Sequence, residues 1–381
     1  MKYNPALPSV ADMAVKARKR VPGFAMDYLE SGIGGEYCLR RNRSDLDEVL
    51  IWPRYLRDVA QVDTRCELFG HRYDLGIGVS PVGLGNMMWP NAEEYLASAA
   101  QQANIPYILS TMSTTLLEKI AELAPAVAWF QLYVPRKREV MQDLIKRVST
   151  AGFNALVVTV DLPVGAKRDK ELKNGLILPF RITPQLLVQV LLRPEWTMLT
   201  LKYGTPRFAN LLPYGDTGDI KHLREFLTKF FTPGVTAECI REIRDLWQGP
   251  LIIKGVQRAS EIEECRALGV DGVIISNHAG RQLDAAPSSI KALRLLPESL
   301  HRKIIIMLDS GIRSGLDVVR AKALGAQAVF SGRSFMYALA ATGQDGGRQV
   351  IEIFRDEITR TLQQVGCVEY QAMNATWLES G

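Results

Sequence analysis

The feature that most constrains the fold is an alternation of short apolar runs with amphipathic stretches, which begins near residue 75. The apolar runs are Leu75–Val79, Pro106–Leu109, Ala128–Leu132, Ala155–Val160, Leu251–Ile253, Gly272–Ile275, Ile304–Leu308 and Ala326–Phe330. Between them lie segments with helical spacing, namely Asn91–Ala103, Arg138–Ala151, Ala259–Leu268 and Gly315–Leu324. Continuous apolar runs are typical of buried parallel strands, because a half-exposed strand alternates apolar and polar residues. Eight strand–helix units therefore predict a (β/α)8 TIM barrel.

An open, doubly wound parallel sheet is the alternative fold for the same alternation. Its dinucleotide-binding form carries a G-x-G-x-x-G motif after the first strand, because the glycines let the backbone approach a pyrophosphate. The chain has no such motif after its first predicted strand. We therefore favour the barrel.

Two segments lie outside the repeat. Residues 1–74 precede the first strand, and we expect them to form a helical cap that closes the N-terminal end of the barrel. The fourth and fifth strands are separated by roughly 90 residues, far more than an ordinary loop. We assign residues 168–235 to an insertion within one domain of residues 1–381. Loops that follow barrel strands lie on the active-site face, so the insertion is predicted to be a lid or a docking element.

Composition excludes several classes of protein. The chain has 381 residues, of which 47% are hydrophobic and 23% charged, which is typical of a folded globular protein. No apolar run reaches the ~20 residues of a spanning helix. The five cysteines include no C-x-x-C, so neither a disulfide framework nor a metal site is expected, and a reducing cytoplasm is the expected compartment. The net charge is +5, and the Lys and Arg residues are scattered along the chain, which favours solvated faces over a nucleic-acid-binding stripe.

The segment Asn174–Pro213 within the insertion is rich in large apolar residues. Its cations are Lys173, Arg181, Arg193, Lys202 and Arg207. An apolar segment edged by cations in an exposed loop indicates a surface that lies in a membrane interface. The alternative is a lid that packs on the barrel or on a neighbouring subunit. We favour the membrane interpretation and keep the lid as its alternative.

Polar residues and glycines follow most of the predicted strands. They are Gln131 and Tyr133, Asp161, Lys254, His278 and Arg281, then Asp309, Gly311 and Arg313, and finally Gly332 and Arg333. A histidine three residues before an arginine offers a base beside a carboxylate clamp, although its position alone fits a packing histidine equally well. A buried lysine at a strand end requires an anion. Glycines and arginines after the last two strands form the usual barrel phosphate site. Together these residues predict an enzyme with a phosphorylated cofactor.

The sequence S-N-H-A-G-R-Q-L-D at 276–284 resembles the signature of the FMN-dependent L-2-hydroxy acid oxidases and dehydrogenases. That family includes glycolate and lactate oxidases, (S)-mandelate dehydrogenase and quinone-linked L-lactate dehydrogenase. The resemblance extends from Tyr28 to Cys367. It implies FMN as cofactor, oxidation of an (S)-2-hydroxy acid to the 2-oxo acid, and a homotetramer.

The resemblance also implies roles for individual residues. His278 is expected to take a proton from the substrate, with Asp161 as its partner. Tyr133 is expected to hydrogen-bond near the substrate hydroxyl, and Lys254 to stabilise reduced anionic flavin. The substrate carboxylate is assigned to Tyr28, Arg168 and Arg281. The flavin contacts are assigned to Pro81, Val82, Gly83, Ser110, Gln131, Thr159 and Ser276, and the phosphate contacts to Asp309, Gly311, Arg313, Gly332 and Arg333.

Three positions depart from the family pattern. Ala279 replaces the glycine that usually follows the histidine, which costs roughly 1 kcal/mol if the position needs a positive φ. Gly83 removes bulk near the flavin, and Met112 stands where glycolate oxidases carry a tryptophan. These differences predict room for a larger substrate side chain, even an aromatic ring, and resemble the mandelate and bacterial lactate dehydrogenases.

The sequence thus predicts an FMN-dependent (S)-2-hydroxy acid dehydrogenase that passes electrons to a quinone at the cytoplasmic side of the inner membrane. A cytoplasmic oxidase that reduces O2 to hydrogen peroxide is the alternative within the same enzyme class. An alternative of another class is a non-catalytic FMN-binding barrel that docks on a membrane or a partner.

Overall fold

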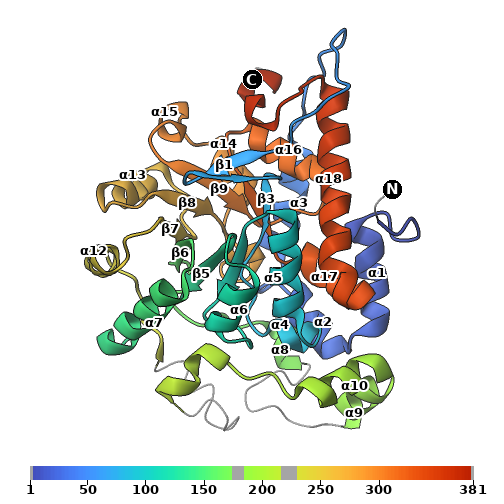
Figure 1. Cartoon of the computed structure of the whole chain (residues 1–381), viewed down its shortest axis with the longest axis vertical. Coiled ribbons are helices and arrows are strands. Elements are labelled where there is room, and N and C mark those ends of the chain that lie inside the picture. Colours follow the sequence, from blue (N-terminus) through green and yellow to red (C-terminus); the bar gives the residue numbers. More distant parts are fainter. Residues whose placement is uncertain (1–2, 174–183, 216–229, 379–381) are drawn as a thin grey trace.

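A closed barrel of eight parallel strands forms the centre of the molecule in the computed structural model, which describes residues 3–173, 184–215 and 230–378 (Figure 1). Its strands are β3 (Ile77–Val79), β4 (Tyr107–Ser110), β5 (Ala128–Leu132), β6 (Ala155–Thr159), β7 (Leu251–Lys254), β8 (Gly272–Ile275), β9 (Ile305–Asp309) and β10 (Val329–Ser331). Closure comes from the parallel pairing of β10 with β3. Each predicted apolar run overlaps one of these strands, so the predicted (β/α)8 barrel is confirmed.

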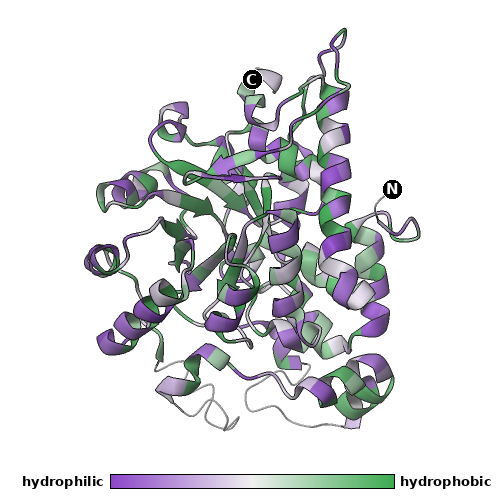
Figure 2. Cartoon of the chain, in the orientation of Figure 1, coloured by the Kyte–Doolittle hydropathy of each residue, from purple (hydrophilic) through white to green (hydrophobic). Residues whose placement is uncertain are grey.

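Helices surround the barrel and turn their apolar faces toward the strands, as Figure 2 shows. They are α5 (Ala92–Ala103), α6 (Leu117–Leu123), α7 (Arg138–Ala151), α12 (Ala237–Leu246), α13 (Ala259–Ala267), α14 (Ser289–Arg294), α15 (Glu298–His301), α16 (Gly315–Ala323), α17 (Arg333–Thr342) and α18 (Gly346–Val365). Short 3-10 turns at Gly343–Asp345, Tyr370–Ala372 and Ala375–Trp377 complete the C-terminal part. Local sequence sets the boundaries: Ser314 and Asp317 form a capping box that begins α16, and Gly152 ends α7 at a φ of 83°.

The N-terminal residues divide between the two ends of the barrel, contrary to the expectation that all of residues 1–74 close its N-terminal end. The hairpin of β1 (Cys66–Leu68) and β2 (His71–Tyr73) lies there. The Phe69 ring at its turn packs beside Trp129, with ring centroids 5.8 Å apart, and against Gly272, where a Cβ would lie 2.7 Å from the ring.

Helix α1 (Val10–Arg20) packs against α17, whereas α2 (Gly23–Glu30) ends near the carboxyl ends of the strands and α3 (Tyr37–Asp47) packs against the turn at His278–Gly280. The amide of Ile33 donates to Gly280 O at 3.0 Å, and Arg333 Nε donates to Leu29 O at 2.7 Å. Arginines at the carboxyl end of the barrel thus find acceptors in the backbone that ends α2. Hydropathy patterns do not report such side-chain to backbone contacts.

The insertion contains α8 (Asp169–Lys173), α9 (Pro184–Leu191), α10 (Pro194–Tyr203) and a 3-10 turn at Ala209–Tyr214. Helices α9 and α10 lie beside α1 and α2 and the short helix α4 (Gly85–Met88) (Figure 1). Trp196 anchors them, because its ring packs edge-on against Phe24 and its Nε1 donates to Met87 O at 3.1 Å. The apolar residues predicted at 176–180, together with Arg181, lie outside the described residues.

Within the three described ranges, no helix combines the length and the hydropathy needed to cross a membrane.

Candidate active site

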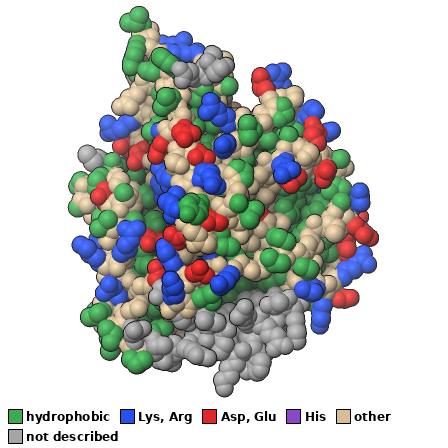
Figure 3. Space-filling model, turned by 180° about the vertical axis from the view of Figure 1, so that it is seen from behind, with side chains coloured by type: hydrophobic (Ala, Val, Ile, Leu, Met, Phe, Trp, Pro, Cys, Tyr) green, Lys and Arg blue, Asp and Glu red, His purple; other side chains and the backbone are tan. Residues whose placement is uncertain are grey.

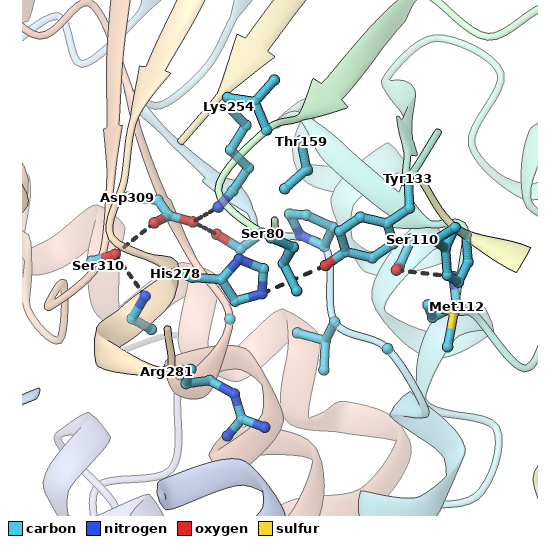
Figure 4. A pocket seen from close by; sticks show the side chains of 18 of the residues that line it. Ser80, Ser110, Met112, Tyr133, Thr159, Lys254, His278, Arg281, Asp309 and Ser310 are labelled. Carbon is cyan, nitrogen blue, oxygen red and sulfur yellow. Dashed lines mark hydrogen bonds and ion pairs between the residues drawn. The ribbon is translucent and has the colours of Figure 1, made fainter. Parts of the chain in front are cut away.

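A cavity of about 570 Å³ opens at the carboxyl ends of the barrel strands. Most of the residues predicted to form the site line it: Tyr28, Pro81, Val82, Gly83, Ser110, Met112, Tyr133, Thr159, Arg168, Lys254, His278, Arg281, Asp309, Gly311, Arg313, Gly332 and Arg333 (Figure 4). Gln131, Asp161 and Ser276 lie directly behind this lining, where each contacts a lining residue. The structure therefore brings all the sequence-predicted site residues to one place.

His278 stands between a carboxylate and a hydroxyl at the centre of the cavity. Its Nδ1 lies 2.9 Å from Asp161 Oδ1, and its Nε2 faces the Tyr133 hydroxyl at 3.5 Å. The carboxylate favours the tautomer with hydrogen on Nδ1, which leaves the Nε2 lone pair toward the cavity. Burial raises the pKa of the Tyr133 hydroxyl, and Asp161 raises it further, so Tyr133 remains a hydrogen-bond donor.

The turn that carries His278 has an unusual backbone. His278, Ala279 and Gly280 form a 3-10 turn in which all three φ angles are positive, at 56°, 57° and 74°. A left-handed alanine costs about 1 kcal/mol, so the departure noted in the sequence is a real strain at this position. The His278 contact with Asp161 is nevertheless intact.

A buried ion pair lies beneath this turn. Lys254 Nζ is 2.9 Å from Asp309 Oδ2 and donates to Ser276 Oγ at 2.9 Å. Ser276 and Ser310 both donate to Asp309 Oδ1, at 2.6 and 2.7 Å, and Ser80 donates to Oδ2 at 3.1 Å. Burial alone raises the pKa of Asp309, but Lys254 and the hydroxyl donors together hold it below its usual value. Asp309 is therefore a carboxylate.

This environment corrects the assignment of Asp309 to a phosphate. A buried carboxylate repels a phosphate, whereas a sugar-alcohol hydroxyl can donate to it. The remaining residues of the predicted phosphate site fit that role. Burial, with Arg313 and Arg281 nearby, lowers the pKa of Arg333 to about 9, and burial also lowers the pKa of Arg313.

The two arginines also lack an acidic partner. Arg333 donates to the backbone carbonyls of Leu29, Ala279 and Ser31. Across the ranges that the structure describes, neither Arg313 nor Arg333 makes an ion pair with a carboxylate. The half-buried guanidinium of Arg313 and the buried one of Arg333, beside the Gly311 and Gly332 backbone, form a site for a dianion.

Other buried polar atoms at the cavity lack protein partners. Gln131 Nε2 and Thr159 Oγ1 are buried and make no hydrogen bond in the structure. Such atoms are rare in native proteins and call for a ligand. A donor amide, a hydroxyl, Lys254 and a dianion site fit the polar edge and the phosphate of FMN, the cofactor that the resemblance implies.

A second group of cations lies on the side of α2. Arg281 donates to the carbonyls of Tyr28 and Ser31 at 2.5 and 3.0 Å and to Glu171 at 2.8 Å. Arg168 Nη1 lies 3.4 Å from the same carboxylate. Burial lowers the pKa of Arg281, and Arg168 lowers it further, so this pair is suited to an additional carboxylate. The Tyr28 hydroxyl donates to Gly83 O at 3.1 Å.

Several cavity residues were not predicted from the sequence. They include Ser80, Arg136, Val164, Phe208 and Phe231, and Glu171 beside the arginines. The Phe231 ring lies 5.7 Å from the Tyr133 ring, centroid to centroid. Val164, Glu171, Phe208 and Phe231 belong to the long connection after β6, where no strand pattern locates a residue.

Glu93 fixes the two loops that carry Gly83 and Met112. Its carboxylate is 4% exposed and accepts from the amides of Thr114, at 2.9 and 3.0 Å, and of Gly85, at 3.3 Å. Leu84 N donates to Met112 O at 3.0 Å, which joins the loops directly. Burial raises the pKa of Glu93 to about 7, although hydrogen bonds from Thr114 and Thr115 oppose the shift.

The described residues include no group of three or more His, Cys, Asp and Glu that could hold a metal ion.

Comparisons with known proteins identify the family. The sequence profile of the FMN-dependent dehydrogenase family matches residues 17–380. An L-lactate dehydrogenase of Pseudomonas syringae pv. syringae (strain B728a) is 35% identical over 372 residues, which cover 97% of this chain and 98% of that protein.

Two solved structures are similar over nearly the whole chain. The monotopic membrane protein (S)-mandelate dehydrogenase superposes with a TM-score of 0.93 at 34% identity, covering 98% of this chain and 100% of that one. Mandelate oxidase with (S)-4-hydroxymandelic acid superposes with a TM-score of 0.83 at 33% identity, covering 97% and 98% of the two chains.

The raised pKa of Glu93 predicts a pH dependence of stability. An unfolded chain releases this proton near pH 4.5, whereas the native state holds it to about pH 7. The native state therefore binds more protons in this window, and the free energy of unfolding falls as pH rises through it. Glu93→Gln removes this pH dependence. Above pH 7, the free energy of unfolding of the variant therefore exceeds that of wild type by up to about 3 kcal/mol.

Denaturant titrations between pH 4.5 and 8 measure the effect. Glu94→Gln is the matched control, because it removes a carboxylate from the same helix at a more exposed position. Parallel pH courses for Glu93→Gln and wild type would contradict the interpretation.

Proposed function

Because the chain belongs to the FMN-dependent dehydrogenase family, we propose that it oxidises an (S)-2-hydroxy acid to the 2-oxo acid and passes the electrons to a membrane quinone. The chain is an FMN-dependent 2-hydroxy acid dehydrogenase of the lactate and mandelate type. The observation that carries the specific reaction is His278, whose Nε2 faces the cavity while Asp161 engages Nδ1 at 2.9 Å. The non-catalytic alternative is not retained, because the relatives are named as dehydrogenases.

The reaction removes two electrons and two protons from the carbon and oxygen of the substrate alcohol. His278 Nε2 takes one proton, and Asp161 stabilises the imidazolium that forms. The hydroxyl of Tyr133, which is protonated and faces Nε2, donates to the substrate hydroxyl oxygen. Arg281, Arg168 and Tyr28 hold the substrate carboxylate, which fixes the reacting carbon relative to the base.

The same cavity accommodates the cofactor. When bound, FMN would supply the acceptor for the two electrons and for the second proton. Lys254, Gln131, Thr159 and Ser110 would hold its polar ring edge, and Arg313, Arg333, Gly311 and Gly332 its phosphate. The Lys254 cation stabilises negative charge on the ring edge. The Asp309 carboxylate would accept from a ribityl hydroxyl.

The wall near Gly83 leaves room for a large substrate side chain. Met112, Phe208, Phe231 and Val164 give this part of the cavity an apolar lining. A Cβ at Gly83 would lie 3.0 Å from Met112 Cβ and 3.6 Å from the Tyr28 hydroxyl. An aromatic 2-hydroxy acid therefore fits, and a side chain at position 83 would enter the space it needs.

Electron transfer to a quinone requires contact with a membrane, and α9 with α10 supplies a suitable surface. Leu187, Val188, Leu191, Leu192, Met198 and Leu201 are exposed on these helices, with Leu191 at 74% and Leu201 at 80%. Figure 3, which shows the molecule from behind, has hydrophobic side chains gathered at its lower left, on the side where α9 and α10 lie.

Cations lie near this surface. Lys19 on α1 and Lys202 on α10 are exposed, and half-buried Arg193, between α9 and α10, donates to the Val21 and Arg18 carbonyls. An apolar face bordered by cations suits an anionic lipid surface. We place the enzyme as a peripheral protein on the cytoplasmic side of the inner membrane. The homotetramer implied by the resemblance remains a prediction.

Gly83→Ala tests the assignment of the substrate side chain. The added methyl group crowds Met112, so kcat/KM for L-mandelate falls about tenfold or more, the scale of one misplaced methyl group in a pocket. L-lactate, which needs less space, is the internal control and loses less. Steady-state kinetics with both acids measure the ratio, and an equal loss for both would contradict the assignment.

His278→Ala tests the base. The variant keeps its FMN, because His278 is not among the residues assigned to the flavin, while turnover with an artificial acceptor falls by at least about a hundredfold. His71→Ala is the matched control, since His71 lies in the hairpin at the opposite end of the barrel. Turnover that survives in His278→Ala would overturn the role of this residue.

The electron acceptor is tested by assaying the enzyme with a soluble ubiquinone analogue and with oxygen. We expect reduction of the quinone to be faster than reduction of oxygen, because α9 and α10 pack on α2, whose Tyr28 lines the cavity. Stoichiometric hydrogen peroxide without quinone reduction would identify an oxidase.

The membrane surface is tested by replacing Leu187, Leu191 and Leu201 together with glutamine. Burial of three leucines accounts for at least about a hundredfold in affinity for anionic vesicles. We expect the triple variant to bind such vesicles more weakly by that factor. The control replaces Leu116, Leu246 and Leu295, which are exposed on other helices or beside them. Sedimentation with vesicles measures binding, and equal binding by both triple variants would exclude this surface.

A further inference from the structure

The turn that carries His278 is held by side-chain oxygens at three consecutive amides. His278 N donates to Ser276 Oγ at 3.0 Å, Ala279 N donates to Ser310 Oγ at 3.0 Å, and Gly280 N donates to Asn277 Oδ1 at 3.1 Å. Ser276 and Asn277 belong to the same connection as the turn. Of these three acceptors, Ser310 is the one that comes from another strand end, after β9.

The orientation of the Ser310 hydroxyl is fixed by Asp309. Ser310 Oγ donates its hydrogen to Asp309 Oδ1 at 2.7 Å. A hydroxyl has one hydrogen, so the Ser310 oxygen can meet the Ala279 amide only as an acceptor. A hydroxyl that donates to a carboxylate is also a stronger acceptor, because hydrogen bonds in a chain polarise one another.

The bond from Ser310 is made at a strained residue, because Ala279, like His278, is a non-glycine residue with a positive φ. An alanine adopts a positive φ at a cost that glycine does not have. Ser310 itself has a φ of 82°, so two residues in direct contact both hold left-handed backbone without being glycine. Strain of this kind persists only where surrounding contacts enforce it.

We infer that Ser310 is a positioning residue for His278, whose hydroxyl, oriented by Asp309, holds the Ala279 amide and keeps the left-handed turn that presents the imidazole to the cavity. The inference rests on the proposed function and extends it to a residue outside direct contact with the substrate. Arg281 is held separately by Tyr28, Ser31 and Glu171, so loss of the Ser310 bond affects the base more than the carboxylate clamp.

The test is a double-mutant cycle of Ser310→Gly and Ala279→Gly in the FMN-loaded enzyme. Glycine suits the φ of 82° at position 310, so Ser310→Gly removes the hydroxyl without backbone strain. We expect kcat to fall roughly fivefold to tenfold, the size that one neutral hydrogen bond gives. KM is expected to stay within about twofold, which separates positioning of the base from substrate binding.

In the Ala279→Gly background, kcat should no longer depend on Ser310, because glycine adopts the positive φ of the turn without the hydrogen bond from Ser310. Adding Ser310→Gly to Ala279→Gly is therefore expected to change kcat by less than about twofold. The matched control is Leu56→Gly, which replaces a non-glycine residue of φ 60° in an exposed loop far from the cavity. It leaves kcat unchanged.

Hydrogen exchange gives a readout that does not depend on activity. Amides in peptides that contain residues 276–284 are expected to exchange faster in Ser310→Gly, with or without Ala279→Gly. The inference is overturned if Ser310→Gly leaves both kcat and exchange at the wild-type level, or if Ala279→Gly fails to remove the kcat effect. If the wild type oxidises neither lactate nor mandelate, the proposed function fails, while exchange still decides whether Ser310 holds the turn.

Discussion

The buried ion pair of Lys254 and Asp309 is the interaction on which the arrangement of the site depends. It joins the ends of β7 and β9, and through Ser276 and Ser80 it also reaches the ends of β8 and β3. A buried charge is costly unless it is paired and hydrogen-bonded, and here the Asp309 carboxylate receives Lys254 and three hydroxyls. Two of the three serines, Ser276 and Ser310, also accept hydrogen bonds from amides of the His278 turn. One carboxylate therefore fixes both the cation proposed to face the cofactor and the backbone of the proposed base.

The distribution of charge around the cavity explains what the remaining space can bind. Among the described residues, half-buried Arg313 and buried Arg333 make no ion pair with a carboxylate, and Arg281 and Arg168 share the carboxylate of Glu171. The two groups of arginines are neighbours, because Arg281 and Arg333 both donate to Ser31 O. An FMN phosphate and a substrate carboxylate would supply the negative charge that these cations lack. The proposed binding of cofactor and substrate thus follows from one electrostatic pattern at the carboxyl ends of the strands.

The parts predicted from the sequence are those set by periodicity and by strand ends. Because every strand of a parallel barrel ends on the same face, a residue such as Lys254 or His278 is located once its strand is recognised. The partners of those residues are not, since Asp309 can equally face a phosphate or a lysine until the geometry is known. Phe208, Phe231 and Glu171 lie within the long connection after β6, where no repeating pattern indicates which side chain turns inward. The N-terminal helices were misplaced for a related reason, because backbone carbonyls that receive Arg333 leave no mark in the sequence.

The central claim is that this cavity removes two electrons from a 2-hydroxy acid. The most direct measurement is an anaerobic titration of the purified FMN-loaded enzyme with L-lactate and with L-mandelate, in which the oxidised flavin absorbance is followed. The account predicts that absorbance disappears in proportion to added substrate, with one 2-oxo acid formed for each flavin reduced. Fully bound FMN whose absorbance neither acid changes would contradict it.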